Sequence, residues 1–436
     1  MSTPALIYDE QSAPPLQRVA LPPVLMAAPV AYTRSLRNIA QALHEAGALR
    51  ALCTSGAANT AFRVARSLSI RRRGMSPDAP PSLQARIIEG VPDSLIHNQV
   101  GWEVARQIVA RVRPHPVALD WLWLRAIHHL DRTSASMLRR DDIQAYVGLE
   151  HASLLALRAA SSLNKRTVLV CASPHSDARR RWVDPEYEAF PELKTQTTPT
   201  LLARQRVADA RRDAELALAD IVLTNSRLTT ESLVSAGVAS EKIVTLPLGI
   251  VGALSSLDER MPDNGTVTFL FAGTVAPHKG VHHLMNAWGR VGRSPAELHL
   301  YGKLLMPPSS LEPRPGLVVH GAVPYRELER AYLSASVLVL PTLYDGFGEV
   351  IGEALAHGVP VITTPRAGAA DLIEHGRNGF IVPPGDPDAL AACMESCVRH
   401  RRQLAGMRQE ALETARRWSW PEYRKRLLQL LAERLH

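Results

Sequence analysis

Short apolar segments alternate with amphipathic helical segments along the whole chain. A short, mainly apolar run indicates a buried strand, whereas apolar residues three or four positions apart indicate a helix. Segment 34–45 shows the helical pattern through Leu36, Ile39 and Leu43, and Gly47 predicts the end of that helix. Strands and helices that alternate in this way are typical of parallel sheets with crossover helices. The pattern therefore predicts an α/β protein.

The expected strands form two series, separated by the polar link Ser255–Gly265. The first series comprises Val24–Met26, Leu49–Cys53, Ile143–Val147, Thr167–Cys171 and Ile221–Thr224. The second comprises Thr266–Phe271, Glu297–Tyr301, Leu317–His320, Val337–Leu340, Val359–Thr363 and Phe380–Val382. We therefore expect two doubly wound parallel sheets, in a front domain over residues 1–248 and a rear domain over residues 249–417.

Segment 172–199 interrupts the pattern in the front domain. It combines prolines and aromatic residues and shows no clear period, which predicts a long loop. Long loops in compact domains are often functional. A charged helix is expected over 200–219, and further helices over 387–402, over 403–418 and from Trp420 onward.

Composition changes this picture little. The 436 residues are 46% hydrophobic and 21% charged, as in ordinary globular proteins. The best candidate for a membrane span, 19–30, is short and contains three prolines, so we expect neither a span nor a secretory signal. Four cysteines without zinc or disulfide spacing favour a reducing cytoplasm. The doublets 128–129 and 282–283 supply paired histidines without an H-E-x-x-H motif, and we predict no metal.

The net charge of +8 lies mostly in the front half. Residues 1–248 hold 30 basic and 23 acidic residues, whereas residues 249–436 hold 20 and 19. The sharpest cluster places five arginines between Arg63 and Arg73, interleaved with apolar residues. It favours contact with an anionic membrane or an acidic acceptor, and the alternative is a solvated arginine-rich loop. No helix-turn-helix, zinc finger or aromatic platform accompanies the charge, so we expect no nucleic-acid partner.

Candidate chemistry first appears after the first rear strand, in the loop from Gly273 to Gly280. Lys279 lies there just before a helix and could neutralise a phosphate as a point charge. The loop lacks the G-x-x-x-x-G-K-[ST] pattern, so it is not a Walker A loop. A surface lysine is the alternative explanation.

A second candidate site follows the strand 337–340. Gly346 and Gly348 precede a helix, whose free backbone N–H groups favour a pyrophosphate. Their spacing differs from the dinucleotide motif, which disfavours a nicotinamide enzyme. Glu353, one turn into the helix, could accept hydrogen bonds from ribose hydroxyls, and Asp345 could orient a sugar hydroxyl. The alternative is that both acids are surface charges.

The segment D-G-F-G at 345–348, followed by E-A-L-A-H-G-V-P-V-I at 353–362, resembles the E-x7-E signature of retaining family-4 glycosyltransferases, or glycosyl transferases group 1. Neighbouring segments resemble further motifs of that family, namely 219–226, 273–280, 376–383 and 418–421. The resemblance covers about residues 218–424, and the front domain only in outline.

The resemblance implies the GT-B fold, in which two Rossmann-like domains face each other across a cleft. It also implies that residues 418–436 return to the front domain as a final helix. The rear domain would hold a nucleoside diphosphate sugar, as substrate and without any cofactor. The implied donor-binding residues are Gly273, Thr274, Lys279, Val323, Asp345, Gly346, Phe347, Gly348, Glu349 and Glu353. Among them, Lys279 would bind the diphosphate, and the backbone amides of Gly348 and Glu349 would bind the phosphate. Glu353 would bind the ribose, and Val323 would lie beside the base.

Two positions of the implied donor site depart from the family pattern. Asp345 replaces the glutamate that holds the donor sugar, and its side chain is one methylene shorter. Thr274 stands where many relatives have a phosphate-binding arginine, which leaves more electrostatic work to Lys279 and the helix end. In the front domain His175 is expected to face the cleft, so the expected catalytic residues are Asp345, Lys279 and His175. Glu150 and the histidine after it are weaker acceptor-side candidates.

The resemblance therefore predicts a metal-independent, retaining glycosyltransferase that acts on an acceptor hydroxyl, in cell-envelope polysaccharide or glycoconjugate synthesis. The basic front domain suggests an anionic or lipid-linked acceptor and a cytoplasmic enzyme that is peripheral at the inner face of the membrane. Two alternatives remain open at this point. One is a nucleotide-sugar epimerase or hydrolase on the same fold, and the other is a noncatalytic subunit that binds nucleotide sugars.

Overall fold

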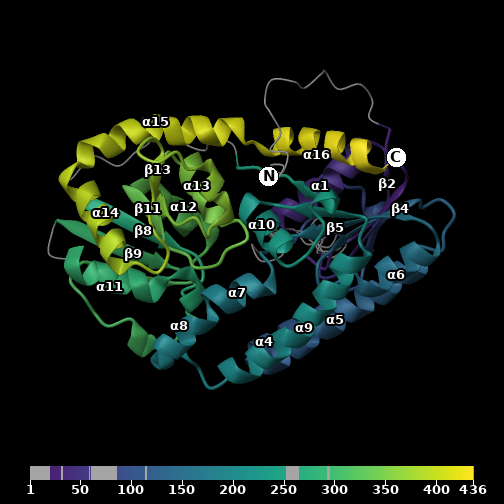
Figure 1. The fold of residues 1–436 in the computed structure, drawn as a ribbon, viewed down its shortest axis with the longest axis horizontal. Coiled ribbons are helices and arrows are strands. Elements are labelled where there is room, and N and C mark those ends of the chain that lie inside the picture. Colours follow the sequence, from purple (N-terminus) through teal and green to yellow (C-terminus); the bar gives the residue numbers. More distant parts are fainter. Residues whose placement is uncertain are drawn as a thin grey trace, which may run out of the picture.

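The computed structural model describes residues 20–30, 33–57, 59, 86–112, 115–251, 265–291 and 295–435, which contain two parallel β-sheets (Figure 1). Strand β1 (Val24–Ala27) shows how the sheets are buried. Val24 and Met26 belong to one apolar cluster, and Leu25 and Ala27 belong to another. A parallel strand buried on both faces requires helices on both faces. The predicted fold class is confirmed.

The first sheet is built from the front half of the chain. Its further strands are β2 (Leu49–Thr54), β3 (Ile96–Asn98), β4 (Ala145–Leu149), β5 (Arg166–Cys171), β6 (Ile221–Thr224) and β7 (Ile243–Thr245). The order across the sheet is β3-β2-β1-β4-β5-β6-β7, and all pairs are parallel. The sequence misses β3 and β7, because each is a three-residue edge strand and too short to show a pattern.

The second sheet contains all six strands that the sequence predicts for the rear half. They are β8 (Val267–Ala272), β9 (Ala296–Tyr301), β10 (Leu317–Gly321), β11 (Val337–Leu340), β12 (Val361–Thr363) and β13 (Gly379–Ile381). Their order is β10-β9-β8-β11-β12-β13, again with parallel pairing. The carboxyl ends of β8 and β11 are neighbours, which brings both candidate donor loops to one edge of the sheet.

The helices of the front half connect these strands. They are α1 (Arg34–Glu45), α4 (Gly101–Val112), α5 (Pro116–Met137), α6 (Leu154–Ser162), α7 (Ser176–Trp182), α8 (Asp184–Ala189), α9 (Thr198–Leu218) and α10 (Arg227–Ser235). The expected long loop over 172–199 is wrong, because α7, α8 and a 3-10 turn at 191–193 occupy it. These helices are too short to show a period. Pro185 and Pro191 lie in their first turns, where the missing N–H leaves no intrahelical bond unmade.

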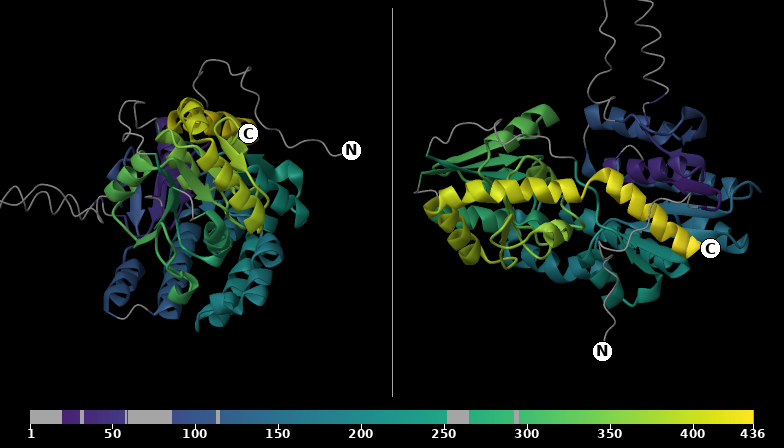
Figure 2. Two further views of the ribbon diagram at one scale, coloured as in Figure 1. Left: turned by 90° about the vertical axis from the view of Figure 1, so that its left-hand side faces the viewer. Right: turned by 90° about the horizontal axis from the view of Figure 1, so that it is seen from above.

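The rear half contributes α11 (Val281–Val291), α12 (Tyr325–Ser334), α13 (Glu349–Ala356), α14 (Pro387–Arg399) and α15 (Arg401–Arg417). The final helix α16 (Trp420–Leu435) begins where the sequence predicts. Figure 2 shows α15 and α16 running one after the other along the length of the molecule. Helix α16 packs against α1, and the Arg424 guanidinium donates a hydrogen bond to Asn38 Oδ1 at 2.8 Å.

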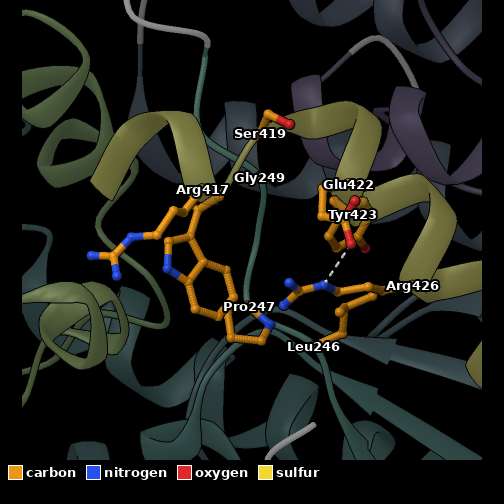
Figure 3. A pocket seen from close by; sticks show the side chains of 9 residues that line it. Leu246, Pro247, Gly249, Arg417, Ser419, Glu422, Tyr423 and Arg426 are labelled. Carbon is orange, nitrogen blue, oxygen red and sulfur yellow. Dashed lines mark hydrogen bonds and ion pairs between the residues drawn. The ribbon is translucent and has the colours of Figure 1, made fainter. Parts of the chain in front are cut away.

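The chain passes between the two halves twice at one place (Figure 3). The Ile250 N–H donates to the Trp418 carbonyl at 2.5 Å, so the two connecting segments lie side by side. A Cβ on Gly249 would lie 2.7 Å from the Trp420 Cα, and only glycine allows this close approach. Leu246 and Tyr423 are among the residues that line a small pocket at this crossing (Figure 3). The pocket therefore belongs to the junction between the domains.

Candidate active site

The first candidate donor loop, residues 273–280, leaves β8 and turns twice before α11. Gly273 has a φ of +136° and Gly280 a φ of +70°, conformations that residues with a Cβ rarely adopt. A Cβ on Gly280 would also lie 2.0 Å from the Pro341 carbonyl oxygen. The two glycines thus allow the loop to press against the segment that follows β11. Thr274 lies between them and is partly exposed.

Hydrogen bonds to the His278 carbonyl link the two candidate donor loops. Its carbonyl accepts hydrogen bonds from the backbone N–H groups of Leu343 and Tyr344, at 2.9 and 3.2 Å, and from the Thr342 hydroxyl at 3.0 Å. Burial, with a smaller effect of Lys279, lowers the pKa of the His278 imidazole to about 4. The imidazole is therefore neutral near pH 7.

The structure brings Lys279 and Asp345 together. The Lys279 ammonium and Asp345 Oδ2 form a hydrogen-bonded ion pair. Their side chains are 17% and 15% exposed, so the pair is mostly buried. The two predicted catalytic residues of the rear domain thus share one position at the edge of the sheet, where each neutralises the other.

The second donor loop lies at the boundary between the domains. A Cβ on Gly346 would come within 1.8 Å of the Ala172 carbonyl oxygen in the front domain, and the Ser226 hydroxyl donates to the Gly346 carbonyl at 2.8 Å. Gly348 has a φ of +82° and forms the N-cap of α13. Phe347 between them is 5% exposed, so its side chain is part of the core.

Helix α13 carries Glu353, the residue predicted to bind the ribose. Its carboxylate already accepts two hydrogen bonds from the protein. Glu353 Oε1 accepts from Arg34 at 3.0 Å, and Oε2 accepts from the Tyr332 hydroxyl at 3.0 Å. Glu349 begins the helix and its side chain is exposed, so its backbone amide is the group that a phosphate would meet. Val323 lies between β10 and α12 and is partly exposed.

Arg34 was not among the residues predicted for the site. It is the first residue of α1 in the front domain, 319 positions from Glu353, and no local pattern relates the two. Burial alone would lower the pKa of Arg34, but the Glu353 carboxylate raises it above its ordinary value. The front domain thus supplies a permanent positive charge beside the donor loops.

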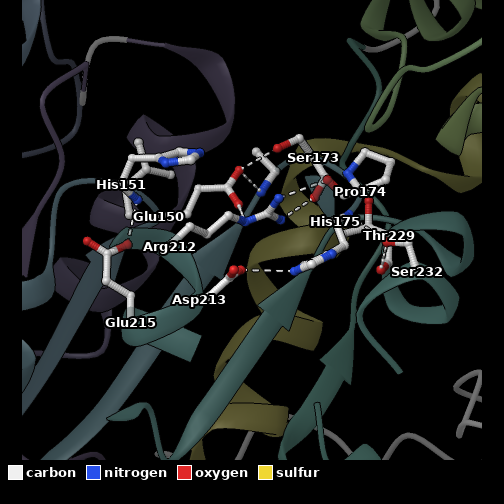
Figure 4. Close-up of polar contacts among 12 residues, drawn as sticks. Glu150, His151, Ser173, Pro174, His175, Arg212, Asp213, Glu215, Thr229 and Ser232 are labelled. Atoms are coloured by element: carbon white, nitrogen blue, oxygen red, sulfur yellow. Dashed lines mark hydrogen bonds and ion pairs between the residues drawn. The ribbon is translucent and has the colours of Figure 1, made fainter. Parts of the chain in front are cut away.

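His175 lies at the start of α7, and its ring points toward Asp213 (Figure 4). Its Nδ1 accepts from the Asp177 N–H at 3.2 Å, and its Nε2 lies 2.9 Å from Asp213 Oδ1. The side chain is 8% exposed. Both ring nitrogens are therefore engaged within the front domain, where His175 caps the helix.

A buried ion pair supports the segment before His175 (Figure 4). Arg212 Nε lies 2.7 Å from Glu150 Oε2, and the two residues are 2% and 7% exposed. Arg212 donates to the carbonyls of Ser173 and Pro174 at 2.5 and 2.8 Å. Glu150 accepts from the Ala172 N–H at 3.0 Å. Glu150, which the sequence indicated as an acceptor-side candidate, thus positions backbone together with Arg212.

The same segment contacts the second donor loop directly. The Tyr344 hydroxyl donates to the Pro174 carbonyl at 2.6 Å, and burial raises the pKa of Tyr344 to about 12. Asn225 donates to the Ala172 carbonyl at 2.9 Å. The Tyr344–Pro174 hydrogen bond therefore joins the rear loop 344–348 to the front segment 172–175, which Asn225 holds from within the front domain.

Comparison with known proteins relates this geometry to a family. Residues 266–400 match the sequence profile of the family described as glycosyl transferases group 1. A GDP-mannose-dependent alpha-mannosyltransferase of Mycobacterium tuberculosis is 31% identical over 201 residues, which are 44% of this chain and 52% of the relative. A D-inositol 3-phosphate glycosyltransferase of Catenulispora acidiphila is 27% identical over 247 residues, which are 50% of this chain and 58% of the relative. The chain thus spans about half the length of these curated relatives.

Solved structures show the same fold over nearly the whole chain. The structure of Anabaena HepE in complex with UDP superposes on this chain with a TM-score of 0.59 at 15% sequence identity. The superposition covers 94% of this chain and 100% of HepE. A structure described as trehalose-6-phosphate from E. coli bound with UDP-2-fluoro glucose gives a TM-score of 0.58 at 12% identity, covering 94% of this chain and 99% of the other. Residues 266–400 are therefore a glycosyl transferases group 1 domain, within a chain that has the two-domain GT-B fold.

Proposed function

We propose that this protein is a retaining glycosyltransferase that moves a sugar from a nucleoside diphosphate sugar to an acceptor hydroxyl without a metal ion. The observation that carries this proposal is the Lys279–Asp345 pair. It lies at the carboxyl edge of the rear sheet, beside the N-terminus of α13 and opposite the front domain. Ligands of open α/β sheets bind at that edge.

In this mechanism the donor separates Lys279 from Asp345. The ammonium pairs with the diphosphate and the aspartate accepts a hydroxyl of the donor sugar, so neither charge is left alone. As the bond from the anomeric carbon to the phosphate oxygen breaks, negative charge grows on the diphosphate. Lys279 and the α13 amides stabilise that charge more strongly in the transition state than in the ground state.

Retention requires the acceptor to attack from the face that the diphosphate leaves. The acceptor oxygen forms the new bond to the anomeric carbon, and its proton passes to the departing phosphate oxygen. Atoms and charge then balance without a protein nucleophile. His175 remains a predicted catalytic residue on the acceptor side. Any role in the reaction requires its ring to release Asp213 or Asp177.

Donor binding also has a consequence for Glu353. If this carboxylate holds the ribose, the hydroxyls compete with Arg34 for Oε1. The released guanidinium would then lie near the diphosphate and supply the cationic group that Thr274 lacks. Arg34 thus makes the donor site depend on both domains.

We place the acceptor at an anionic membrane surface on the cytoplasmic side, where envelope glycoconjugates would be assembled. Arg63–Arg73, the segment that first suggested a membrane, lies outside the described residues. Support from the described part is an exposed stripe on α4, where Val104, Ile108 and Val112 are 51%, 55% and 73% exposed. Apolar residues at this spacing, beside the exposed Arg111 of the same helix, suit a membrane interface. Within the described residues, no helix has the length and apolar character needed to cross a membrane.

Incubation with a panel of labelled nucleotide sugars tests the proposal. Release of the nucleoside diphosphate is measured in EDTA, with and without an extract of envelope acceptors. A glycosyltransferase releases nucleotide faster with the acceptor and moves the label to it. Equal turnover without acceptor would identify an epimerase or hydrolase, and tight donor binding without turnover would identify a binding subunit.

A further inference from the structure

Two histidines of the rear domain meet one glutamate of the front domain beside the donor loops. Glu186, on α8, places Oε2 2.8 Å from His282 Nε2 and 3.0 Å from His283 Nε2, both on α11. The three potential ligand atoms all lie within 4.8 Å of one another. The histidine spacing alone predicts no metal, because Glu186 is 96 positions away in the chain. Only the fold reveals the third group.

The surroundings of these residues direct both imidazoles toward a single point. The histidine side chains are 6% and 7% exposed, and their ring centroids lie 4.0 Å apart. The edge-to-face contacts of Phe190 cover both rings, at 5.0 and 5.9 Å between centroids. Both Nδ1 atoms are buried without a hydrogen-bond partner. The two Nε2 atoms therefore converge on Glu186 Oε2, and the two Nδ1 atoms make no hydrogen bond.

We propose that Glu186, His282 and His283 bind a divalent transition-metal ion of the Zn²⁺ type. Imidazole and carboxylate together suit such ions, whereas Mg²⁺ and Ca²⁺ take oxygen ligands. With bonds of about 2.0–2.2 Å, the ligands of a tetrahedral ion lie about 3.3–3.5 Å apart. Each histidine Nε2, now 2.8 or 3.0 Å from Glu186 Oε2, therefore needs to move only about 0.5 Å away from that oxygen. Three protein ligands leave a fourth position for water.

The position of the site indicates a structural role for the ion. Glu186 comes from the front domain, and α11 begins directly after Lys279 and Gly280. A bound ion would therefore tie the front domain to the loop that carries Lys279. It would hold the two domains together at this contact and take no part in bond breaking. Metal binding at these residues is independent of the proposed glycosyl transfer.

Calorimetric titration of the metal-stripped full-length protein with ZnCl₂ tests the site, with MgCl₂ as the comparison ion. We expect one Zn²⁺ per chain with micromolar or tighter affinity, and no heat from Mg²⁺. Glu186→Gln and His283→Asn should each weaken Zn²⁺ binding at least tenfold. The absorption of bound Co²⁺ reports the coordination number independently, and a four-coordinate spectrum is expected in the wild type only.

His320→Asn is the matched control, because it removes an exposed histidine that lies 3.0 Å from His299 in the same domain. This variant should keep the wild-type affinity. Circular dichroism of each stripped variant checks that it is folded before titration. Absence of stoichiometric Zn²⁺ binding to the wild type would overturn the proposal. So would binding that survives both ligand variants, or binding that disappears in His320→Asn.

Discussion

Arg34 of the front domain lies 3.0 Å from Glu353 of the rear domain, and this ion pair crosses the boundary at which the donor is expected to bind. Its side chains are 28% and 12% exposed, so water screens the pair only partly. The Glu353 carboxylate also accepts from Tyr332. The Glu353 carboxylate, the predicted ribose-binding group, is thus oriented by one residue of each domain, and a bound ribose would compete with the one from the front domain.

Replacing Glu353 by Gln should weaken binding of the cognate nucleoside diphosphate by about 1.5–3 kcal/mol, because a charge-assisted acceptor is lost while the shape is kept. Calorimetry with the nucleoside diphosphate measures the change. Glu395→Gln, on α14 of the same domain, is the control and should leave affinity unchanged. Equal affinities of Glu353→Gln and wild type would remove Glu353 from the ribose site.

Replacing Arg34 by Ala shows whether Arg34 binds the diphosphate or only blocks the ribose position. If Arg34 moves to the diphosphate, the variant should bind the donor about tenfold more weakly, and Thr274→Arg in the same chain should restore part of the affinity. Donor titrations of the single and double variants measure both steps. Tighter binding by Arg34→Ala would mean that Arg34 only blocks the ribose position.

Replacing Lys279 by Ala should lower kcat about 100-fold or more, because its partner is the phosphate on which charge develops. Binding of the free nucleoside, which lacks that phosphate, should hardly change. Steady-state kinetics and nucleoside titration give the two numbers, with Lys425→Ala on α16 as the control. Undiminished turnover in Lys279→Ala would place the lysine outside the site.

The lowered pKa of Glu103 predicts that the fold loses stability in acid. Burial alone would raise its pKa, but hydrogen bonds from Arg106, Gln107 and Arg86 lower it to about 2. A carboxylate with a lowered pKa stabilises the fold above the ordinary pKa of 4.5, and this contribution disappears as the pH falls toward 2. Glu103→Gln should therefore cost about 3 kcal/mol at pH 7 and about 1.4 kcal/mol at pH 3.

Urea unfolding at the two pH values measures that difference. Glu89→Gln is the control, because the Glu89 side chain is 76% exposed and pairs with Arg37 only at 3.6 Å. It should change stability little at either pH. A Glu103→Gln cost that is the same at pH 7 and pH 3 would mean that packing, not charge, is lost.

Membrane association should depend on charge and on salt. Each basic residue near an anionic surface contributes about 1 kcal/mol, and screening acts within about 8 Å at physiological salt. Cosedimentation with anionic vesicles should fall as salt rises, and Arg71, Arg72 and Arg73 changed to Ser should reduce it. The Ile108→Ser variant tests the α4 stripe. Equal absence of binding to anionic and neutral vesicles at low salt would contradict the membrane proposal.

The sequence predicts the position of the two candidate donor loops well, because their determinants are local. Glycines and acids follow directly after two apolar strands, and parallel strands bring such loops to one edge. Neither Arg34 nor Arg212 could be found in this way. Their partners, Glu353 and Glu150, are distant in the chain, and only the packed domains bring them into contact. The α7 and α8 helices were missed for a different reason, because one or two turns show no period.

The stereochemistry of transfer tests the central claim most directly. Once the nucleotide-sugar panel has identified a donor, ¹H NMR of the anomeric proton follows the sugar from donor to product during turnover by the wild-type enzyme. The account predicts a glycosidic product whose anomeric configuration equals that of the donor. An inverted product would contradict attack from the face of the leaving diphosphate, and free sugar as the only product would contradict a transferase.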